Sequence, residues 1–481
     1  MRITVTSSPK RILFVSSEFG GYAKVGGLGD VSAALPRALK RFHDVRVLVP
    51  GYSELLRAAP RLRIVGRMDA FAGLPHCDLG RFETVDGLTV YALVCANLYE
   101  RDGTPYCEPS GGDWDDNDIR FGRLASAATE IACGSADPGW RPDLIHVNDW
   151  TSALAPAYVA WRGCSIPSIL TIHNAAYAGI FDRERLGPLG VPESAFTVDG
   201  MEFYGRASFL KAGISYCSHV TTVSSTYADE ITRPEFGCGL DGVLRLKAEE
   251  GRLTGIVNGI DRSWDPRRDP HLDRPFEIGD WGSRQANAKA LRKAFGLAVS
   301  EGPLFAVISR LVHQKGVDLT IQATESIVRQ GGQIVVAGRG DPGLESELAN
   351  LAVKYRGKVG VKIGYEDGLA RRMYAGSDFL LMPSRFEPCG LTQMYAQRFG
   401  SLPIAHQTGG LADTIQDGVT GFLFQDASLA PMLNAIYRSF DVFSSARRLG
   451  AMRRAAMKRH FGWQRSAKKY TEVYEHAARS H

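Results

Sequence analysis

The chain has 481 residues, more than one domain of ordinary size, so we expect at least two domains. Hydrophobic residues make up 44% and charged residues 23%, as in a soluble globular protein. The net charge of +5 is small and no lysine or arginine run stands out, which argues against a nucleic-acid partner. No apolar run reaches the roughly 20 residues of a membrane span. The first ten residues do not form a signal peptide, so we expect a cytoplasmic protein without a membrane partner.

The eight cysteines are scattered, with no Cys-x-x-Cys pair and no Cys/His spacing suited to zinc. This spacing predicts neither a disulfide framework nor a structural metal. We expect reduced thiols, most of them buried.

The first half of the chain alternates strand-like and helix-like segments. Arg11–Ser17 predicts a strand, followed by a glycine-rich loop and a helix to about Arg41. A long segment rich in Gly, Asp, Pro and Tyr, Asn97–Asp118, interrupts the alternation and is typical of a lid or binding loop. Further buried strands are expected at Asp44–Pro50, Leu88–Ala96, Leu144–Val147, Ser168–Ile172 and His219–Val223. The pattern predicts an α/β domain.

The glycine-rich loop is Lys24-Val-Gly-Gly-Leu-Gly-Asp30. Gly26 and Gly27 allow backbone N–H groups to approach an anion, and Lys24 adds a mobile positive charge for a phosphate. The spacing fits neither the dinucleotide fingerprint nor the Walker pattern, so a flexible loop with a solvated lysine stays an alternative.

Polar and aromatic residues follow two later strands. Residues 149–151 come after one strand, and His173 and Asn174 come after the next. Because parallel strands end at one edge of a sheet, we expect these residues at the same edge as Lys24. A structural hydrogen-bonding role is the alternative for His173.

The composition becomes proline-rich and charged around Trp264–Pro270, and the strand pattern lapses until Leu304, so we place a domain hinge there. The second half then repeats the alternation and predicts a second doubly wound domain. Its strands are expected at Leu304–Ser309, Gln333–Ala337, Val359–Ile363, Phe379–Met382 and Leu402–Ala405.

Two cations follow the first strand of the second half. An arginine fork at Arg310 and a lysine at Lys315 can clamp a diphosphate, although a pair of surface charges is the alternative. With two such domains, a ligand would bind between them, and we expect Lys24 to face this pair across a cleft.

The run Phe379–Met382 predicts a buried strand that leads through a loop into a helix. The carboxylate of Glu387 in this loop can accept two sugar hydroxyls. The backbone N–H groups of Gly390, Leu391 and Thr392 favour a phosphate. An ordinary strand-to-helix turn with a solvated glutamate is the alternative.

The segment Gly338-Arg-Gly-Asp-Pro-Gly343 fits the dinucleotide pattern G-x-G-x-x-G. Pro342 is unusual within that pattern, and no acidic residue stands at the end of the next strand, which ends at Ile363. We interpret the segment as a tight strand-to-helix turn beside the nucleotide site. A dehydrogenase would need a nicotinamide fingerprint, and this is the only match.

A series of longer motifs runs from about residue 11 to residue 473: Lys24–Asp30, Thr171–Asn174, Glu202–Gly205, Phe209–Gly213, Pro234–Gly242, Asn258–Asp261, Ser309–Gly316, Pro383–Gln393 and Thr408–Thr414. In order and spacing they resemble bacterial glycogen synthases and plant starch synthases. The resemblance implies two Rossmann-like, doubly wound α/β domains facing across a cleft, the GT-B glycosyltransferase architecture.

The resemblance also implies that the two domains bind different substrates. Residues 1–265 would form the acceptor-glucan domain (the starch synthase catalytic domain), residues 266–460 the nucleotide-sugar domain, and residues 461–481 a helix that crosses back to the first domain. The implied reaction transfers glucose from ADP-glucose to the non-reducing end of glycogen or another α-1,4-glucan. It retains the anomeric configuration and uses no metal and no cofactor.

By this resemblance, Lys24, Arg310 and Lys315 neutralise the leaving diphosphate, and Glu387 holds the glucose hydroxyls. The leaving phosphate takes the proton of the acceptor in a front-face attack, so no obligatory nucleophile is assigned. The expected substrate-binding residues are Lys24, Gly26, Gly27, Asp30, Thr151, His173, Asn174, Asn258, Tyr365, Gly390, Leu391 and Thr392.

One departure concerns Thr151. Bacterial members usually read His-Asp-Trp-His where this chain has Asn148-Asp149-Trp150-Thr151. The second histidine of that pattern contacts the 6-hydroxyl of the sugar, so this contact is in question here. The sequence leaves open a related enzyme that uses UDP-glucose or another acceptor. A non-catalytic glucan-binding module would not need the three cations and Glu387 together.

Overall fold

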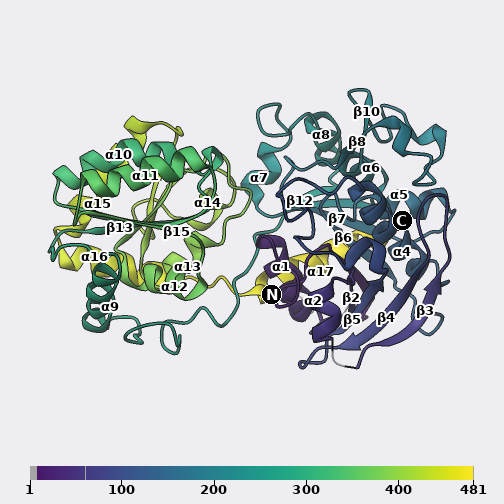
Figure 1. Cartoon of the computed structure of the whole chain (residues 1–481), viewed down its shortest axis with the longest axis horizontal. Coiled ribbons are helices and arrows are strands. Elements are labelled where there is room, and N and C mark those ends of the chain that lie inside the picture. The colour runs from purple at the N-terminus through teal and green to yellow at the C-terminus, as the bar shows by residue number, and fades with distance from the viewer. Residues whose placement is uncertain (1–7, 60, 480–481) are drawn as a thin grey trace. The chain divides into compact units, whose positions relative to one another are not determined.

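The computed structural model describes residues 8–59 and 61–479. The chain forms two compact α/β units (Figure 1). The first unit contains the residues up to Gly259 and those from Trp463 onward. The second unit comprises Ile260–Gly462. The boundary therefore falls just ahead of the hinge expected around Trp264.

The first unit is built on a nine-stranded sheet with the order β12-β11-β7-β6-β1-β2-β5-β4-β3. Its strands are β1 (Arg11–Val15), β2 (Asp44–Pro50), β3 (Arg63–Met68), β4 (Cys77–Glu83), β5 (Thr89–Val94), β6 (Leu144–Asn148), β7 (Ser168–Ile172), β11 (His219–Thr222) and β12 (Leu253–Gly255). All pairings are parallel except those of β3 with β4 and of β4 with β5. A small sheet, β8 (Ile180–Phe181), β10 (Arg206–Ser208) and β9 (Glu202–Phe203), accompanies it.

Helices surround this sheet, and the C-terminal helix packs into its core. The helices are α1 (Gly27–Leu39), α2 (Ser53–Ala58), α3 (Ala96–Tyr99), α4 (Asn117–Ala132), α5 (Leu154–Trp161), α6 (Phe209–Tyr216), α7 (Ser225–Glu230), α8 (Asp241–Glu249) and α17 (Trp463–Arg479), with 3₁₀ turns at Arg183–Arg185 and Glu193–Ala195. Trp463, Tyr470 and Tyr474 of α17 are buried against α1 and β1 residues. The Oη of Tyr474 also lies 2.7 Å from Nδ1 of His146 on β6.

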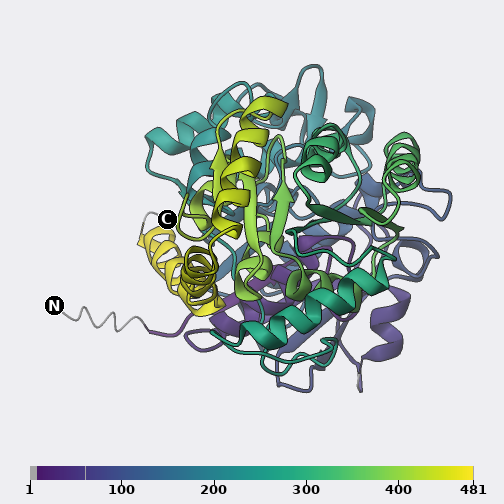
Figure 2. The same ribbon diagram turned by 90° about the vertical axis from the view of Figure 1, so that its left-hand side faces the viewer.

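The second unit is a six-stranded, wholly parallel sheet with the order β15-β14-β13-β16-β17-β18. Its strands are β13 (Leu304–Ile308), β14 (Gln333–Gly338), β15 (Val359–Ile363), β16 (Phe379–Met382), β17 (Leu402–His406) and β18 (Phe422–Phe424). The helices are α9 (Trp281–Ala294), α10 (Val317–Arg329), α11 (Pro342–Lys354), α12 (Asp367–Gly376), α13 (Thr392–Arg398), α14 (Gly409–Thr414), α15 (Leu429–Phe443) and α16 (Ala446–Met457), with a 3₁₀ turn, η3, at His313–Lys315. Figure 1 shows α10 and α11 on one face of the sheet and α12 and α13 on the other, and Figure 2 shows the same ribbon turned by 90° about the vertical axis.

These two sheets confirm the predicted α/β class with two doubly wound domains. Every strand predicted from the sequence is present, but β3, β4, β12, β18 and the three short strands β8, β9 and β10 were not predicted. Half of the β3 residues are exposed, and Arg63 and Arg67 interrupt its sequence, so it lacks the apolar run that marks the buried strands. β12 and β18 have three residues each, too short for a periodic pattern.

The prediction of eight reduced thiols is wrong for two of them, because Cys133 and Cys164 form a disulfide. Cys133 caps the C-terminal end of α4, and Cys164 follows the C-terminal end of α5. These two helices pack together, which brings the sulfur atoms close although 31 residues separate them. A spacing rule cannot detect such a tertiary contact.

The glycine-rich segment at 338–343 forms a tight turn between β14 and α11. The Asp341 side chain accepts a hydrogen bond from Leu344 N and so caps the helix, and Pro342 occupies the first turn. A Cβ at Gly338 or Gly340 would lie about 2 Å from the carbonyl oxygen of Ser309 or Leu311. Packing against this neighbouring loop therefore explains the two glycines.

No helix within residues 8–59 and 61–479 combines the length and the apolar character that a membrane span requires.

Candidate active site

Several of the candidate site residues follow strands at the point where the strand order of each sheet reverses. In the first unit the chain winds outward in both directions from the β6/β1 pair, and in the second from the β13/β16 pair. Loops that follow such strands diverge and leave a crevice at the carboxyl edge, which is where open α/β sheets bind ligands. Lys24 follows β1, whereas Lys315 follows β13 and Glu387 follows β16.

Glu18 organises the glycine-rich loop, a role that the sequence analysis missed. Its Oε2 accepts hydrogen bonds from Val25 N at 2.7 Å and from Gly26 N at 3.0 Å. The Gly26 N–H therefore binds this carboxylate in the structure, where we had expected it to face an anion. An added Cβ on Gly26 or Gly27 would meet no atom within 4 Å, so the space beside both glycines is open. Glu18 stands at the end of the first strand segment, a position that could have signalled it.

Lys24 and Asp30 form an exposed ion pair with an Nζ–Oδ1 distance of 2.7 Å. Such a pair in solvent contributes at most about 1 kcal/mol, so Lys24 can exchange this partner for a phosphate at little cost.

The loops after β6 and β7 meet at Asp149. Its Oδ1 accepts hydrogen bonds from His173 N at 2.7 Å and from Asn174 N at 3.4 Å. Asp149 adopts φ 53°, a left-handed conformation that Asp and Asn tolerate better than most residues. Burial raises the pKa of Asp149 to about 7. The structure thus confirms that these residues converge at one edge of the sheet.

Hydrogen bonds fix the tautomer of His173. Nδ2 of Asn148 donates to Val15 O, which turns Oδ1 of Asn148 toward His173 Nε2 at 3.0 Å. Because burial lowers the pKa of His173 to about 3, the ring is neutral and Nε2 carries the proton. Nδ1 is then an acceptor that suits a sugar hydroxyl.

Thr151 lies beneath this edge, with only 2% of its surface exposed. Its hydroxyl donates to Ser17 Oγ at 3.0 Å, and Ser17 Oγ lies 3.0 Å from the hydroxyl of Tyr106. Tyr106 belongs to the long loop after α3 and donates to Glu18 Oε1 at 2.6 Å. The long loop is thereby tied to the glycine-rich loop through Glu18. Nothing in the local sequence of this loop marked Tyr106.

Asn258, shortly after β12, is 6% exposed. Its Oδ1 is buried and has no hydrogen-bond partner among the described residues. Buried polar atoms are rarely left unpaired, so this oxygen is a candidate acceptor for a ligand hydroxyl.

The second unit brings together two predicted site residues, Lys315 and Glu387. Lys315 Nζ lies 2.5 Å from Glu387 Oε2, and Ser384 Oγ donates to the same oxygen at 3.0 Å. The side chains of Lys315 and Glu387 are 18% and 8% exposed. A cation and a carboxylate therefore share the crevice edge between β13 and β16.

Arg310 is exposed and is oriented by Gln314, whose Oε1 accepts from Arg310 Nη2 at 3.2 Å. Gly390 has φ 65°, a conformation that glycine adopts readily, and directly precedes the start of α13 at Leu391 and Thr392. Tyr365 follows β15 and is 69% exposed, so its ring presents an aromatic face.

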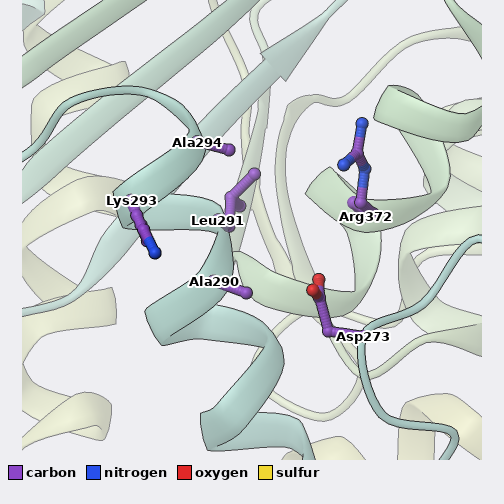
Figure 3. A pocket seen from close by; sticks show the side chains of 6 residues that line it. All are labelled: Asp273, Ala290, Leu291, Lys293, Ala294 and Arg372. Carbon is purple, nitrogen blue, oxygen red and sulfur yellow. The ribbon is translucent and has the colours of Figure 1, made fainter.

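A hollow of about 330 Å³ lies elsewhere on the second unit, between α9 and α12 (Figure 3). Its lining residues are Asp273, Ala290, Leu291, Lys293, Ala294 and Arg372, and none of them is a predicted site residue. It is therefore separate from the crevice edge.

Comparisons with known proteins identify the family of this chain. The family model "Starch synthase catalytic domain" matches residues 11–246, and "Glycosyl transferases group 1" matches residues 290–439. The chain is 57% identical to glycogen synthase 1 of Bradyrhizobium diazoefficiens over 457 residues, which is 95% of this chain and 99% of the relative. It is 56% identical to the glycogen synthase of Pseudomonas fluorescens strain Pf-5, over 97% of this chain and 89% of the relative.

Among solved structures, the chain is similar to the catalytic domain of starch synthase IV from Arabidopsis thaliana bound to ADP and acarbose. The TM-score is 0.87 with 32% identity, over 98% of this chain and 100% of that one. The resemblance inferred from the motifs is confirmed. The chain belongs to the family of bacterial glycogen synthases and starch synthases, which are glucosyltransferases.

Proposed function

We propose that the protein is a glycogen synthase that transfers glucose from ADP-glucose to the non-reducing end of an α-1,4-glucan with retention of configuration. The observation that carries the proposal is the pairing of Lys315 with Glu387 at the strand-order reversal of the second unit. A nucleotide sugar needs cations for its diphosphate and hydrogen-bond acceptors for its hydroxyls, and this edge supplies both kinds of group.

Lys315 and Arg310 would neutralise the diphosphate as the bond to glucose breaks and negative charge develops on the leaving oxygen. Glu387 would accept hydrogen bonds from glucose hydroxyls, since a carboxylate is a strong acceptor in a partly buried site. The first N–H groups of α13, with those of Gly390 and Leu391, would bind the distal phosphate. The exposed ring of Tyr365 offers a stacking surface for the base.

The first unit would contribute acceptors for the sugar and the glucan. His173 Nδ1 and the unpaired Asn258 Oδ1 are placed for hydroxyl donors, with Asp149 and Asn174 supporting this edge. Lys24 would exchange its ion pair with Asp30 for a phosphate of the donor. The leaving phosphate would take the proton of the attacking hydroxyl, so no side chain is assigned as a nucleophile.

The Arabidopsis starch synthase domain is bound to ADP, which supports ADP-glucose as the donor over UDP-glucose. We further propose that the reaction needs no metal, because two protein cations can neutralise the diphosphate. The cytoplasmic location expected from the sequence stays a prediction.

The test is incubation of the purified protein with glycogen and either radiolabelled ADP-glucose or UDP-glucose, each with and without EDTA. We expect nucleotide release and labelled polymer from ADP-glucose in both buffers. β-Amylase should release the label, because it cleaves α-1,4 bonds from non-reducing ends. Faster turnover with UDP-glucose than with ADP-glucose would identify UDP-glucose as the donor. Loss of turnover in EDTA with recovery in manganese would disprove the metal-independent mechanism.

A further inference from the structure

A forked ion pair ties the loop after β16 to the segment after β13. Arg385 Nη1 donates to Asp318 Oδ1 at 2.9 Å, and Arg385 Nη2 donates to Asp318 Oδ2 at 2.7 Å. Both side chains are about one quarter exposed. Two parallel hydrogen bonds fix direction as well as distance, which a single-point lysine contact does not.

The same two loops are joined by further hydrogen bonds around the fork. Arg385 Nη1 also donates to His313 O at 2.5 Å, and Arg385 N donates to Gln314 O at 2.8 Å. Gln314 Nε2 lies 3.4 Å from Phe386 O, while its Oε1 holds Arg310. The Arg385–Asp318 ion pair therefore lies within a set of hydrogen bonds that connects the two loops and, through Gln314, includes Arg310.

The fork stands next to the groups that the proposed reaction uses. Asp318 comes three residues after Lys315, and Arg385 comes two residues before Glu387. The guanidinium of Arg385 lowers the pKa of Asp318, so the carboxylate is charged at neutral pH. Because Asp318 and His313 O occupy the Arg385 fork, this arginine acts through its neighbours instead of on the diphosphate.

We propose that Arg385 and Asp318 are positioning residues that hold Lys315, Arg310 and Glu387 in the arrangement required for glucosyl transfer. This inference rests on the proposed function. Without the fork, the loops after β13 and β16 can separate, and Lys315 and Glu387 no longer face the donor together. A displacement of about 1 Å at reacting groups can cost about 10²-fold in rate.

The experiment compares Arg385→Ala, Arg385→Lys and Asp318→Asn with a matched pair in the same unit. Arg438 and Asp417 form an exposed ion pair in which the single nitrogen Nη2 lies 2.8 Å from both carboxylate oxygens, and they lie on α15 and before β18. We expect Arg385→Ala to lower kcat for ADP-glucose and glycogen by about 10²-fold. Arg438→Ala should stay within about twofold of wild type, since exposed pairs contribute little.

Arg385→Lys separates positioning from charge, because it keeps the cation but cannot form the fork. We expect it to lose most of the kcat that Arg385→Ala loses, with a smaller change in KM. Adding guanidinium at a non-denaturing concentration should restore part of the activity of Arg385→Ala and leave Arg438→Ala unchanged. Wild-type kcat in Arg385→Lys, or a kcat loss in Arg438→Ala as large as in Arg385→Ala, would overturn the inference.

Hydrogen–deuterium exchange provides a readout that does not depend on activity. In Arg385→Ala and Asp318→Asn, peptides covering residues 313–318 and 384–390 should exchange faster, while Arg438→Ala should leave both peptides as in wild type. Unchanged exchange in Asp318→Asn would overturn the positioning role. If the wild-type protein transfers no glucose, the proposed function fails, whereas exchange still tests the fork.

Discussion

Lys315 Nζ lies 2.5 Å from Glu387 Oε2, although 72 residues separate them in the chain. The distance is set by the sheet, because β13 and β16 are paired neighbours and the two residues follow their carboxyl ends. An ammonium group has three N–H donors, so Lys315 can keep Glu387 and still donate to a phosphate. The pair is therefore compatible with simultaneous binding of diphosphate and sugar.

Replacing Lys315 should affect both turnover and stability. We expect Lys315→Ala to lower kcat by about 10²–10³, the usual loss for one preorganised charge stabiliser worth roughly 2.7–4 kcal/mol. The melting temperature should also fall, because Glu387 loses its cation in a mostly buried position. Arg310→Ala is the matched variant, with a similar kcat loss but an unchanged melting temperature, since Arg310 is exposed. Wild-type turnover in both variants would show that neither cation takes part in glucosyl transfer.

Glu387→Gln keeps the size of the side chain and removes its charge. Hydrogen bonds to charged groups contribute roughly 1.5–3 kcal/mol, so kcat/KM should drop by about 10–10²-fold. Steady-state kinetics with ADP-glucose checks this, and Ser384→Ala tests whether the hydroxyl that also binds Oε2 matters independently. A near-normal kcat/KM for Glu387→Gln would show that the charge of Glu387 contributes little to binding or transfer of glucose.

The titration of Asp149 should make the free energy of unfolding depend on pH. Burial raises its pKa from 3.8 to about 7, so between these values the folded protein keeps a proton that the unfolded chain has lost. The stability from protonated Asp149 is complete below about pH 4 and is lost as pH rises through about 7.

Asp149→Asn removes this titration, and Asn tolerates the same left-handed φ. Thermal unfolding of wild type and variant between pH 5 and pH 8 should show the variant gaining relative stability as pH rises, by at most about 1.4 kcal/mol per pH unit. A difference that does not change with pH would contradict the raised pKa of Asp149.

The Cys133–Cys164 disulfide should stabilise the first unit. Closing a loop of 31 residues restricts the unfolded chain by about 3–4 kcal/mol in the chain-entropy model. Dithiothreitol should therefore lower the melting temperature of wild type but not of Cys133→Ser. Iodoacetamide should modify six of the eight cysteines in unreduced, denatured protein. Labelling of all eight would show that the pair is reduced in the isolated protein.

The sequence predicted the parts of the structure that depend on local pattern. Strands such as β2, β7, β15 and β16 consist mostly of apolar and β-branched residues, so their bounds were predicted to the residue. Arg310, Lys315 and Glu387 follow such strands, and their position at the crevice edge was predictable for that reason.

The groups that support the site were not predictable in this way. Glu18, Tyr106, Gln314 and Arg385 make tertiary contacts between loops, and the local sequence does not show whether a polar loop residue has such a partner. The disulfide was missed for the same reason, because the packing of α4 on α5 brings its two cysteines together.

The last prediction concerns Thr151, where bacterial relatives usually have histidine. If the smaller side chain left a water-filled gap, Thr151→His would replace a water-mediated contact by a direct one and lower KM a few-fold. The structure favours overpacking instead, because Thr151 is 2% exposed and its hydroxyl already binds Ser17, which contacts Tyr106.

Inserting an imidazole at Thr151 should therefore displace the Ser17–Tyr106 contact and cost about 1–3 kcal/mol of stability. We expect a higher KM for ADP-glucose and a lower kcat, since Tyr106 also holds Glu18 and, through it, the glycine-rich loop. Thr151→Ser is the control that keeps the hydroxyl, and Thr151→Val keeps the shape without it. Steady-state kinetics and melting temperatures of the three variants distinguish the two outcomes. A Thr151→His protein with wild-type kcat and lower KM would show that the space beside Thr151 is hydrated and that Tyr106 has not filled it.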